Sequence, residues 1–142
     1  MNILAGRFKG HNIRTVAKAS YRPTASRIRK SIFDILGDLD GCSVLDLFAG
    51  SGILGFEAAS RGAAAVTFVD NDRRNVQLMH VNSQFLQDQV DMKVVCKECF
   101  HYLRVRHEYD IIFADPPYGK IDIFKLVEKC LTTLLNNGRF VL

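Results

Sequence analysis

The sequence has no hydrophobic run near the roughly 18 residues that a membrane span requires, and its N-terminus lacks the apolar segment of a signal peptide. It also has no low-complexity segment, and 48% of its 142 residues are hydrophobic. These features predict one soluble, globular domain with a single core, located in the cytoplasm.

Acidic residues are missing from the first 30 positions, which hold eight Lys or Arg. The whole chain has a formal net charge of +4, so the residues after position 30 are net negative. A basic segment on an acidic body favours a polyanionic partner, most simply a nucleic acid. A solvated basic tail without a partner is the alternative.

The sequence also lacks a second cysteine pair to match its one CxxC, formed by Cys96 and Cys99. A lone CxxC is a weak indication of zinc, even with His101 and His107 nearby. We therefore expect reduced thiols and no bound metal. No Ser/His/Asp or Cys/His arrangement typical of nucleophilic catalysis is evident.

What the chain does contain is a glycine turn between two regular segments. Residues 44–55 read VLDLFAGSGILG: an apolar run, then Gly50-Ser51-Gly52, then helix-forming residues. This order is typical of the first unit of an open parallel sheet, where the backbone approaches a ligand closely. About 20 residues beyond the turn, the apolar segment 66–69 leads into Asp70, which is placed to bind ribose hydroxyls. A nucleoside cofactor is the first hypothesis.

Two cofactors are compatible with this turn. Gly50, Gly52 and Gly55 match GxGxxG, so a nicotinamide dinucleotide is one candidate. Asp46 at the end of the strand disfavours a pyrophosphate and favours a cationic amine. Residues 46–52 also resemble the first motif of S-adenosylmethionine-dependent methyltransferases, whose cofactor has an amine, a sulfonium and a ribose but no phosphate. We therefore expect S-adenosylmethionine.

Strand-like and helix-like segments alternate from residue 42 onward. Strands are expected at about 43–48, 65–70, 92–96 and 110–115, a fifth from residue 139, and helices at about 52–61, 72–87, 99–105 and 121–135. This order predicts an α/β fold with a doubly wound, mostly parallel sheet and ligands at the carboxyl ends of its strands. The last helix is expected to stop at Asn137-Gly138 and to bury Ile123, Phe124, Val127, Cys130, Leu131 and Leu134.

Residues 1–37 are predicted to form an RNA-binding extension packed on a core of residues 38–142. Its parts are a basic-tipped β-hairpin over 2–16 and a helix that Thr24 caps and Gly37 ends. The expected apolar face of this helix is Ile28, Ile32, Ile35 and Leu36. The candidate RNA-binding residues are Arg7, Phe8, Lys9, Arg14, Arg22 and Arg29. Phe8 either stacks on a base or folds back on the hairpin.

The fourth strand leads into Asp115-Pro116-Pro117-Tyr118, a rigid and extended exit at the ligand-binding edge. DPPY resembles the fourth motif of methyltransferases that act on exocyclic amines of nucleobases. Such an amine is a poor nucleophile, so the Asp115 carboxylate and the Pro116 carbonyl are expected to bind its N–H groups and orient its lone pair. Tyr118 offers a ring on which the extruded base can stack.

The N-terminal third of the sequence narrows the resemblance to one family of these methyltransferases. Arg22-Pro23-Thr24, Arg27, Arg29 and residues 31–36 (SIFDIL) resemble the RPT…R.R…LF..L segment of the RsmD family. Residues 3–10 (ILAGRFKG) resemble the N-terminal hairpin of that family, so the resemblance covers essentially the whole chain. It implies a Rossmann-like methyltransferase that methylates the N2 amine of a guanine in 16S ribosomal RNA, acting as a monomer on the small subunit or its assembly intermediate.

The resemblance also implies which residues hold the cofactor. Asp46 and the turn Phe48-Ala49-Gly50-Ser51-Gly52 would surround its methionine part, with Asp70 at the ribose and Asn71 beside the adenine. Glu98 and Cys99 stand where the family more often has Asn or Asp followed by Ala, near the adenine amine. Thr24 and Arg27 either reach the cofactor carboxylate or simply cap and solvate their helix.

Two alternatives stay open. One is an amino-methyltransferase of another nucleic acid, acting on adenine N6 in DNA or RNA, because DPPY suits both bases. The other is a non-catalytic RNA- or cofactor-binding module. It is suggested by a sequence that ends in the fifth strand, where methyltransferases of this fold continue to a sixth and seventh. An exposed fifth strand is an adhesive sheet edge, so a fragment of a longer protein is the favoured interpretation.

Overall fold

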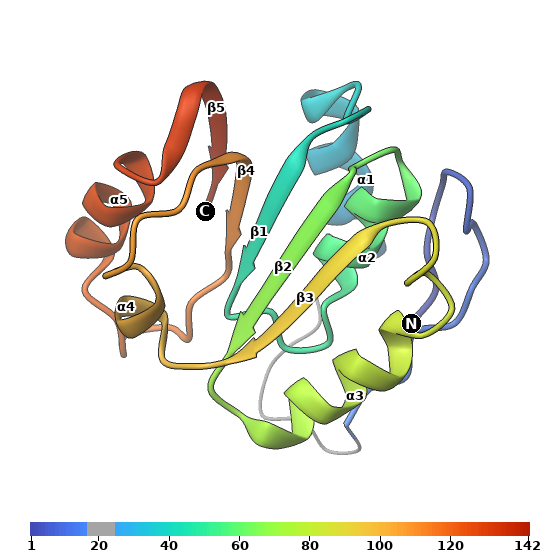
Figure 1. Ribbon diagram of the computed structural model, residues 1–142, viewed down its shortest axis with the longest axis horizontal. Helices are drawn as coiled ribbons and strands as arrows, with labels where there is room; N and C mark the ends of the chain where they lie inside the picture. Colours follow the sequence, from blue (N-terminus) through green and yellow to red (C-terminus); the bar gives the residue numbers. More distant parts are fainter. Residues whose placement is uncertain (17–24) are drawn as a thin grey trace.

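In the computed structural model, the description covers residues 1–16 and 25–142. Five parallel strands form one sheet in the order β3-β2-β1-β4-β5 (Figure 1). The strands are β1 Ser43–Leu47, β2 Ala65–Asp70, β3 Asp91–Cys96, β4 Tyr109–Ala114 and β5 Leu134–Val141. The helices are α1 Ser26–Leu36, α2 Ile53–Ser60, α3 Arg73–Ser83, α4 Cys99–Tyr102 and α5 Ile123–Leu131. The predicted doubly wound α/β fold is confirmed.

Helices cover both faces of the sheet and divide the core into two clusters. Side chains of α1, α2 and α3 pack on one face, together with Ile3 and Ile13 from the N-terminal segment. Side chains of α4 and α5 pack on the other face, around Leu45, Leu47 and Ile112. The central strands β1 and β4 are apolar on both faces because both faces are covered.

Helix α2 is the most deeply embedded helix, with all eight residues buried. Its sequence is apolar on every side apart from Glu57 and Ser60, as expected for a helix enclosed by protein. Gly55 lets it lie close to the sheet, because a Cβ at this position would stand 2.3 Å from the Phe68 ring. The third glycine of the GxGxxG match therefore serves helix–sheet packing.

The apolar face predicted for α1 is only partly right: Leu36 is buried and Ile32 packs against the core, but the other two residues are not buried. The helix begins at Ser26 with Ala25 at its N-cap, and it buries Arg29, Phe33 and Leu36. Ile28 and Ile35 are exposed, to 55% and 86%. The buried face is rotated because Phe33 packs against Phe113 of the sheet and the Arg61 guanidinium lies over the Phe33 ring. Thr24, the predicted cap, lies outside the described residues.

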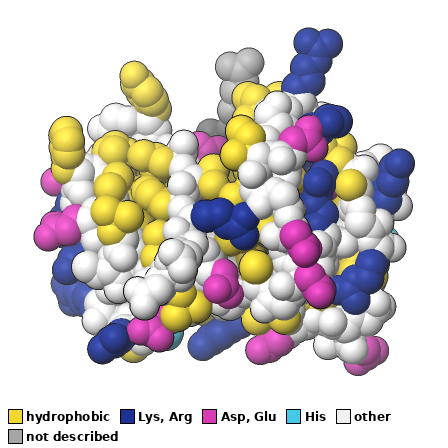
Figure 2. All heavy atoms as spheres, turned by 90° about the horizontal axis from the view of Figure 1, so that it is seen from above, with side chains coloured by type: hydrophobic (Ala, Val, Ile, Leu, Met, Phe, Trp, Pro, Cys, Tyr) yellow, Lys and Arg dark blue, Asp and Glu magenta, His cyan; other side chains and the backbone are white. Residues whose placement is uncertain are grey.

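The end of the chain also departs from the prediction. Helix α5 stops at Leu131, where the hydroxyls of Thr132 and Thr133 donate to the Lys129 carbonyl. Asn137-Gly138 is not a helix stop: it lies inside β5, beside an irregular register with β4, and Asn137 has a φ of 65°. Of the predicted apolar face, Cys130 is buried while Ile123, Phe124 and Leu131 are exposed. Viewed from above, hydrophobic side chains gather on the α5 and β5 side (Figure 2).

The predicted hairpin is only partly formed. Residues 1–16, called the arm below, contain one antiparallel bridge between Asn2 and Asn12 and no regular strand. The arm forms a turn over residues 5–10 and buries Ile3 and Ile13 in the core. Among the helices in the described part of the chain, none combines the length and hydrophobicity needed to cross a membrane.

Candidate functional site

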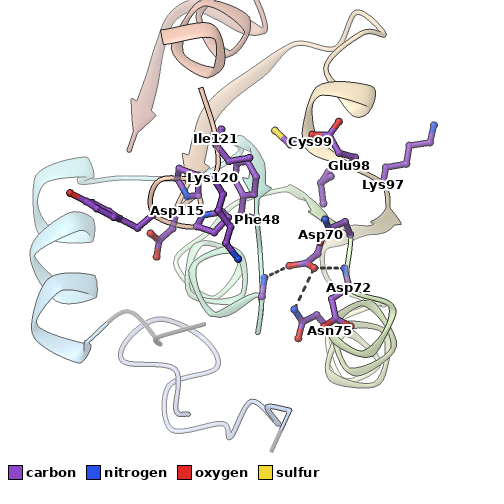
Figure 3. Close-up of a pocket in the computed structure, with 16 residues that line it drawn as sticks. Phe48, Asp70, Asp72, Asn75, Lys97, Glu98, Cys99, Asp115, Lys120 and Ile121 are labelled. Atoms are coloured by element: carbon purple, nitrogen blue, oxygen red, sulfur yellow. Dashed lines mark hydrogen bonds between the residues drawn. The ribbon is translucent and has the colours of Figure 1, made fainter. Parts of the chain in front are cut away.

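A cavity of about 650 Å³ lies at the carboxyl ends of β1, β2, β3 and β4 (Figure 3). The chain proceeds from β1 to β2 and β3 on one side, then crosses over to β4 and β5 on the other. Crevices form in open α/β sheets where the strand order reverses in this way. The cavity is therefore in the position where open α/β sheets bind their ligands.

Asp70, at the end of β2, organises one wall of the cavity. Its carboxylate accepts hydrogen bonds from the backbone N–H of Gly50 at 2.7 Å and of Asp72 at 2.8 Å, with the Asn75 amide at 3.4 Å. These three bonds fix its orientation and occupy three of the roughly four acceptor positions of the carboxylate, which leaves one on the oxygen that faces Gly50. Asp70 lines the cavity, as expected from its place at the end of a strand, and its contact with ribose hydroxyls stays a prediction.

The glycine turn has the backbone shape that a close approach requires. Phe48, Gly50 and Gly52 have φ values of 56°, 55° and 74°, a region that glycine enters without strain. Phe48 and Gly50 line the cavity, whereas Ala49, Ser51 and Gly52 do not. Gly52 faces inward, where a Cβ would stand 2.9 Å from the Phe56 ring. Only part of the predicted turn therefore faces the cavity.

Asp46 does not line the cavity either. It is buried, and its carboxylate accepts the Gly55 N–H at 3.0 Å, bracing the turn from behind. Burial raises the pKa of Asp46 to about 8; the Gly55 hydrogen bond opposes this rise, and the charges of Asp70 and Asp115 add to it. In this structure Asp46 supports the turn through Gly55, and its predicted contact with the cofactor stays a prediction.

Glu98 and Cys99 line the side of the cavity next to β3. One oxygen of Glu98 accepts the His101 N–H at 2.9 Å and caps α4, which leaves its other oxygen available to a ligand. Burial raises the pKa of the Cys99 thiol to about 12, so this side chain is neutral. Asn71 also lines the cavity, in agreement with its predicted position.

The four residues Asp115 to Tyr118 form the opposite wall. They follow β4 without regular structure, and a turn in which the Lys120 N–H donates to Pro117 closes the segment. Asp115 and Tyr118 are exposed, and the Tyr118 ring is fully open to solvent. An acceptor and an unpacked aromatic ring therefore stand together at the cavity mouth.

Several lining residues were not predicted from the sequence, namely Val69, Asp72, Asn75, Lys97, Lys120 and Ile121. Lys97 directly follows β3 and Asp72 comes two residues after the end of β2, so the rule that ligands lie at strand ends could have found them. Asn75 and Lys120 carry no such signal. Lys120 points toward the space between Asp115 and Asp70, whereas Lys97 points away from it (Figure 3).

The candidate RNA-binding residues are not equally available. Arg7, Lys9 and Arg14 are exposed on the arm. Arg27, a candidate for the cofactor carboxylate, is exposed on α1 and is not among the residues that line the cavity. Arg29 is only 2% exposed and donates to the Asn2 carbonyl, so its predicted contact with RNA is wrong for this conformation. Arg22, like Thr24, lies outside the described residues.

Phe8 is half-buried. Its ring meets Phe85 edge to face, with 5.8 Å between centroids, while His11 stacks on Phe85 at 3.5 Å. Of the two predicted possibilities for Phe8, the structure has the one in which it folds back on the protein.

The charges that line the cavity fit S-adenosylmethionine better than a dinucleotide. Four lining residues are acidic (Asp70, Asp72, Glu98 and Asp115) and two are basic (Lys97 and Lys120). This balance favours a cationic ligand and disfavours a pyrophosphate. The carboxylates suit ribose hydroxyls and an adenine amine, and Asp115 lies across from Asp70 (Figure 3). Fold and site together define a methyltransferase of the Rossmann-like type.

Comparison with known proteins identifies the family. The chain matches, over residues 1–142, the family described as Conserved hypothetical protein 95, and it belongs to this family. Ribosomal RNA small subunit methyltransferase D of Buchnera aphidicola (subspecies Acyrthosiphon pisum) is 34% identical over 98% of this chain and 71% of its own length.

Solved structures agree with this assignment. The hypothetical protein TTHA0928 of Thermus thermophilus superposes with a TM-score of 0.82 at 28% identity, covering 99% of this chain and 83% of its own. SMU.776, whose structure holds S-adenosylhomocysteine, superposes with a TM-score of 0.64 at 29% identity, covering 79% of this chain and 33% of its own. The predicted family and fold are both confirmed.

Proposed function

We propose that the protein transfers a methyl group from S-adenosylmethionine to the exocyclic N2 amine of a guanine in 16S ribosomal RNA. The observation that carries the chemistry is the position of Asp115-Pro116-Pro117-Tyr118 on the cavity wall opposite Asp70. The substrate class is supported by relatives that are named as ribosomal RNA small subunit methyltransferases.

The cofactor is held by residues of three strand ends. Asp70 would accept the ribose hydroxyls, Glu98 the adenine amine, and the Phe48–Gly50 part of the turn would contact the methionine portion. When bound, S-adenosylmethionine would supply an electrophilic methyl group on a sulfonium, whose sulfur leaves as the neutral thioether of S-adenosylhomocysteine and needs no acid. The acidic lining lowers the electrostatic free energy of this cation in the cavity.

Asp115 and Pro116 prepare the nucleophile. The carboxylate and the Pro116 carbonyl accept the two N–H groups of the amine, which turns its lone pair toward the cofactor. As nitrogen gains positive charge, the Asp115 carboxylate stabilises it, and the excess proton leaves afterwards to Asp115 or to water. Tyr118, with no protein neighbour on its ring, stacks against the extruded base.

The choice of guanine N2 over adenine N6 is supported by the Arg22-Pro23-Thr24 segment, which resembles the RsmD family. The exposed cations Arg7, Lys9 and Arg14 support a contact with RNA phosphates. A substrate in the small ribosomal subunit or its assembly intermediate would place the protein in the cytoplasm, where we propose that it acts as a monomer.

The decisive experiment is transfer of a tritiated methyl group to small ribosomal subunits that lack their own guanine methylations, followed by mapping of the labelled base. Label on guanine N2 is the expected result. Label on adenine N6 would show that the protein is a methyltransferase with a different target base. Absence of transfer, with cofactor binding intact, would favour the non-catalytic module.

A further inference from the structure

We propose that helix α2 holds the turn of residues 4–10 of the arm as a rigid loop that presents Arg7 and Lys9 to RNA phosphates, with Glu57 and Ser60 as positioning residues. The inference rests on the proposed function, because its partner is the RNA substrate. The arm is thereby a preformed binding surface and not a flexible basic tail.

Glu57 makes the first attachment. Its side chain is fully buried, and its carboxylate accepts the backbone N–H of Leu4 at 2.7 Å and of Ala5 at 3.1 Å. It is also paired with the Arg61 guanidinium at 2.8 Å, and Arg61 lies over the Phe33 ring of α1. A buried carboxylate is stable only when it is paired and hydrogen-bonded, so the arm completes a site that α2 alone would leave unsatisfied.

Ser60, one turn further along α2, makes the second attachment. Its hydroxyl accepts the Phe8 N–H at 2.9 Å and donates to the Ala5 carbonyl at 2.6 Å. Its own carbonyl accepts the Arg7 N–H at 2.7 Å. Three hydrogen bonds therefore bracket Arg7 at the level of the backbone, while its guanidinium stays exposed over the Phe8 ring.

Gly6 allows this close contact. A Cβ on Gly6 would stand 1.9 Å from the Ser60 carbonyl oxygen, and the residue has a φ of +83°. Gly10, on the other side of the same turn, has a φ of +87° with nothing within 4 Å of a Cβ. The two glycines thus share a backbone conformation, but only Gly6 touches α2.

The other end of the arm is attached to α3 and the segment after it. The Asn82 amide exchanges two hydrogen bonds with the backbone of Arg14, at 3.1 Å and 2.9 Å, and Phe85 packs against Phe8 and His11. The turn between these attachments is therefore fixed on both sides. Such fixation removes much of the ordering entropy that a flexible basic tail loses on binding.

The charge of the loop determines the partner. Arg7 and Lys9 are exposed, form no ion pair within the described residues, and belong to a stretch of 30 residues without Asp or Glu. Two cations held at fixed positions on a polar turn suit the phosphate groups of a nucleic acid.

The matched pair Gly6→Ala and Gly10→Ala tests the loop without changing any charge. Binding to a 16S rRNA transcript is measured at several salt concentrations, with S-adenosylhomocysteine affinity and thermal unfolding as checks. Gly6→Ala, which must lift the loop from α2, is expected to weaken RNA binding roughly tenfold relative to Gly10→Ala, with unchanged cofactor affinity. Equal RNA affinity and salt dependence for the two folded variants would overturn the proposal.

Two further variants test the proposal even if the Gly6→Ala protein does not fold. Ser60→Ala removes both side-chain hydrogen bonds to the loop and should raise the KM for RNA with kcat unchanged. Arg7→Gln with Lys9→Gln should flatten the slope of log K against log salt by roughly 1.4–1.8, the effect of two phosphate contacts. An unchanged KM for Ser60→Ala, or an unchanged salt slope for the double variant, would contradict the proposed role of the loop in RNA binding.

Failure of the proposed function gives a different pattern. A wild-type protein that bound no ribosomal RNA would overturn the proposed function and the role of the loop with it. A wild-type protein that bound and methylated RNA, with all these variants behaving like it, would overturn the loop alone.

Discussion

The Asp70 carboxylate and the Gly50 backbone N–H, 20 positions apart in sequence, form a buried hydrogen bond of 2.7 Å. It joins the end of β2 to the turn that follows β1. A second bond to the Asp72 N–H ties the same carboxylate to the start of α3. The residue expected to bind the ribose therefore also sets the shape of the glycine turn.

Asp70→Asn should accordingly weaken cofactor binding more than the loss of a ligand contact alone. The amide keeps one acceptor oxygen, but its NH2 group must face either the Gly50 or the Asp72 N–H. Loss of hydrogen bonds to a charged group, at roughly 1.5–3 kcal/mol each, predicts at least a tenfold rise in the Kd for S-adenosylhomocysteine, measured by calorimetry. Asp88→Asn, on an exposed loop residue, is the control. Equal affinity of both variants would remove Asp70 from the cofactor site.

Asp46 should make stability depend on pH. Its pKa is about 8 in the folded protein, against roughly 3.9 for an unfolded Asp, so the native state retains a proton that the unfolded state has lost. The corresponding stabilisation is complete below pH about 4 and is lost as the pH rises through about 8. Asp46→Asn cannot ionise and keeps an acceptor for Gly55. Urea unfolding between pH 5 and 8 should show a smaller decrease in its free energy of unfolding than in the wild type. Parallel pH profiles would show that Asp46 titrates normally.

Much of the fold was predictable because the buried strands are nearly continuous apolar runs. The apolar run Ile111–Phe113 is typical of a strand buried on both faces of a parallel sheet. The loop after such a strand lies at the edge of the sheet where ligands bind. Asp70 and Asp115 were found because each follows a predicted parallel strand, and parallel strands bring their carboxyl ends to one edge of the sheet; the spacing after the glycine turn and the DPPY motif then pointed to these two residues.

What sequence could not determine is the direction in which particular side chains point. Asp46 lies next to the last residue of β1 and Asp70 ends β2, but only Asp70 lines the cavity, since the Asp46 carboxylate is hydrogen-bonded to the Gly55 N–H. The helical spacing of Ile28, Ile32 and Ile35 indicated an apolar face, yet packing against Phe113 selects the Phe33 face. Arg29 looked like a surface cation because the Asn2 carbonyl to which it donates is 27 positions away in the sequence.

Arg29 and Arg27 provide a direct test of the difference between a buried and an exposed arginine on the same helix. Both lie on α1, but Arg29 is buried and its carbonyl partner is on the arm, whereas Arg27 is exposed. Arg29→Ala should lower the free energy of unfolding by roughly 1–3 kcal/mol, because the Asn2 carbonyl loses its donor and packing is lost. Arg27→Ala should change it by less than about 0.5 kcal/mol. Similar unfolding midpoints in urea would contradict the buried position of Arg29.

Tyr118 should matter for RNA and not for folding. Its ring is fully exposed, so Tyr118→Ala is expected to leave the unfolding temperature and cofactor affinity essentially unchanged. Loss of a stacked base costs roughly 1–3 kcal/mol, which predicts a 5- to 150-fold decrease in kcat/KM for ribosomal subunits. Tyr118→Phe keeps the ring and should be mild. A Phe variant as impaired as the Ala variant would point to the hydroxyl and not to stacking.

Asp115 should act as a hydrogen-bond acceptor that positions and stabilises the amine, not as the base that deprotonates it first. A neutral aryl amine is too weak an acid for a carboxylate to deprotonate, whereas the cationic amine formed by attack of the lone pair loses its proton easily. Asp115→Asn keeps the size of the side chain and one acceptor oxygen but removes the charge. It should therefore lower methyl transfer by roughly 10²–10³-fold, the effect of losing one electrostatic stabiliser, while S-adenosylhomocysteine still binds. Single-turnover transfer of a tritiated methyl group measures the step directly. Transfer at the wild-type rate, or label on a ring nitrogen of guanine, would exclude this mechanism, since both require a nucleophile that does not depend on the Asp115 charge.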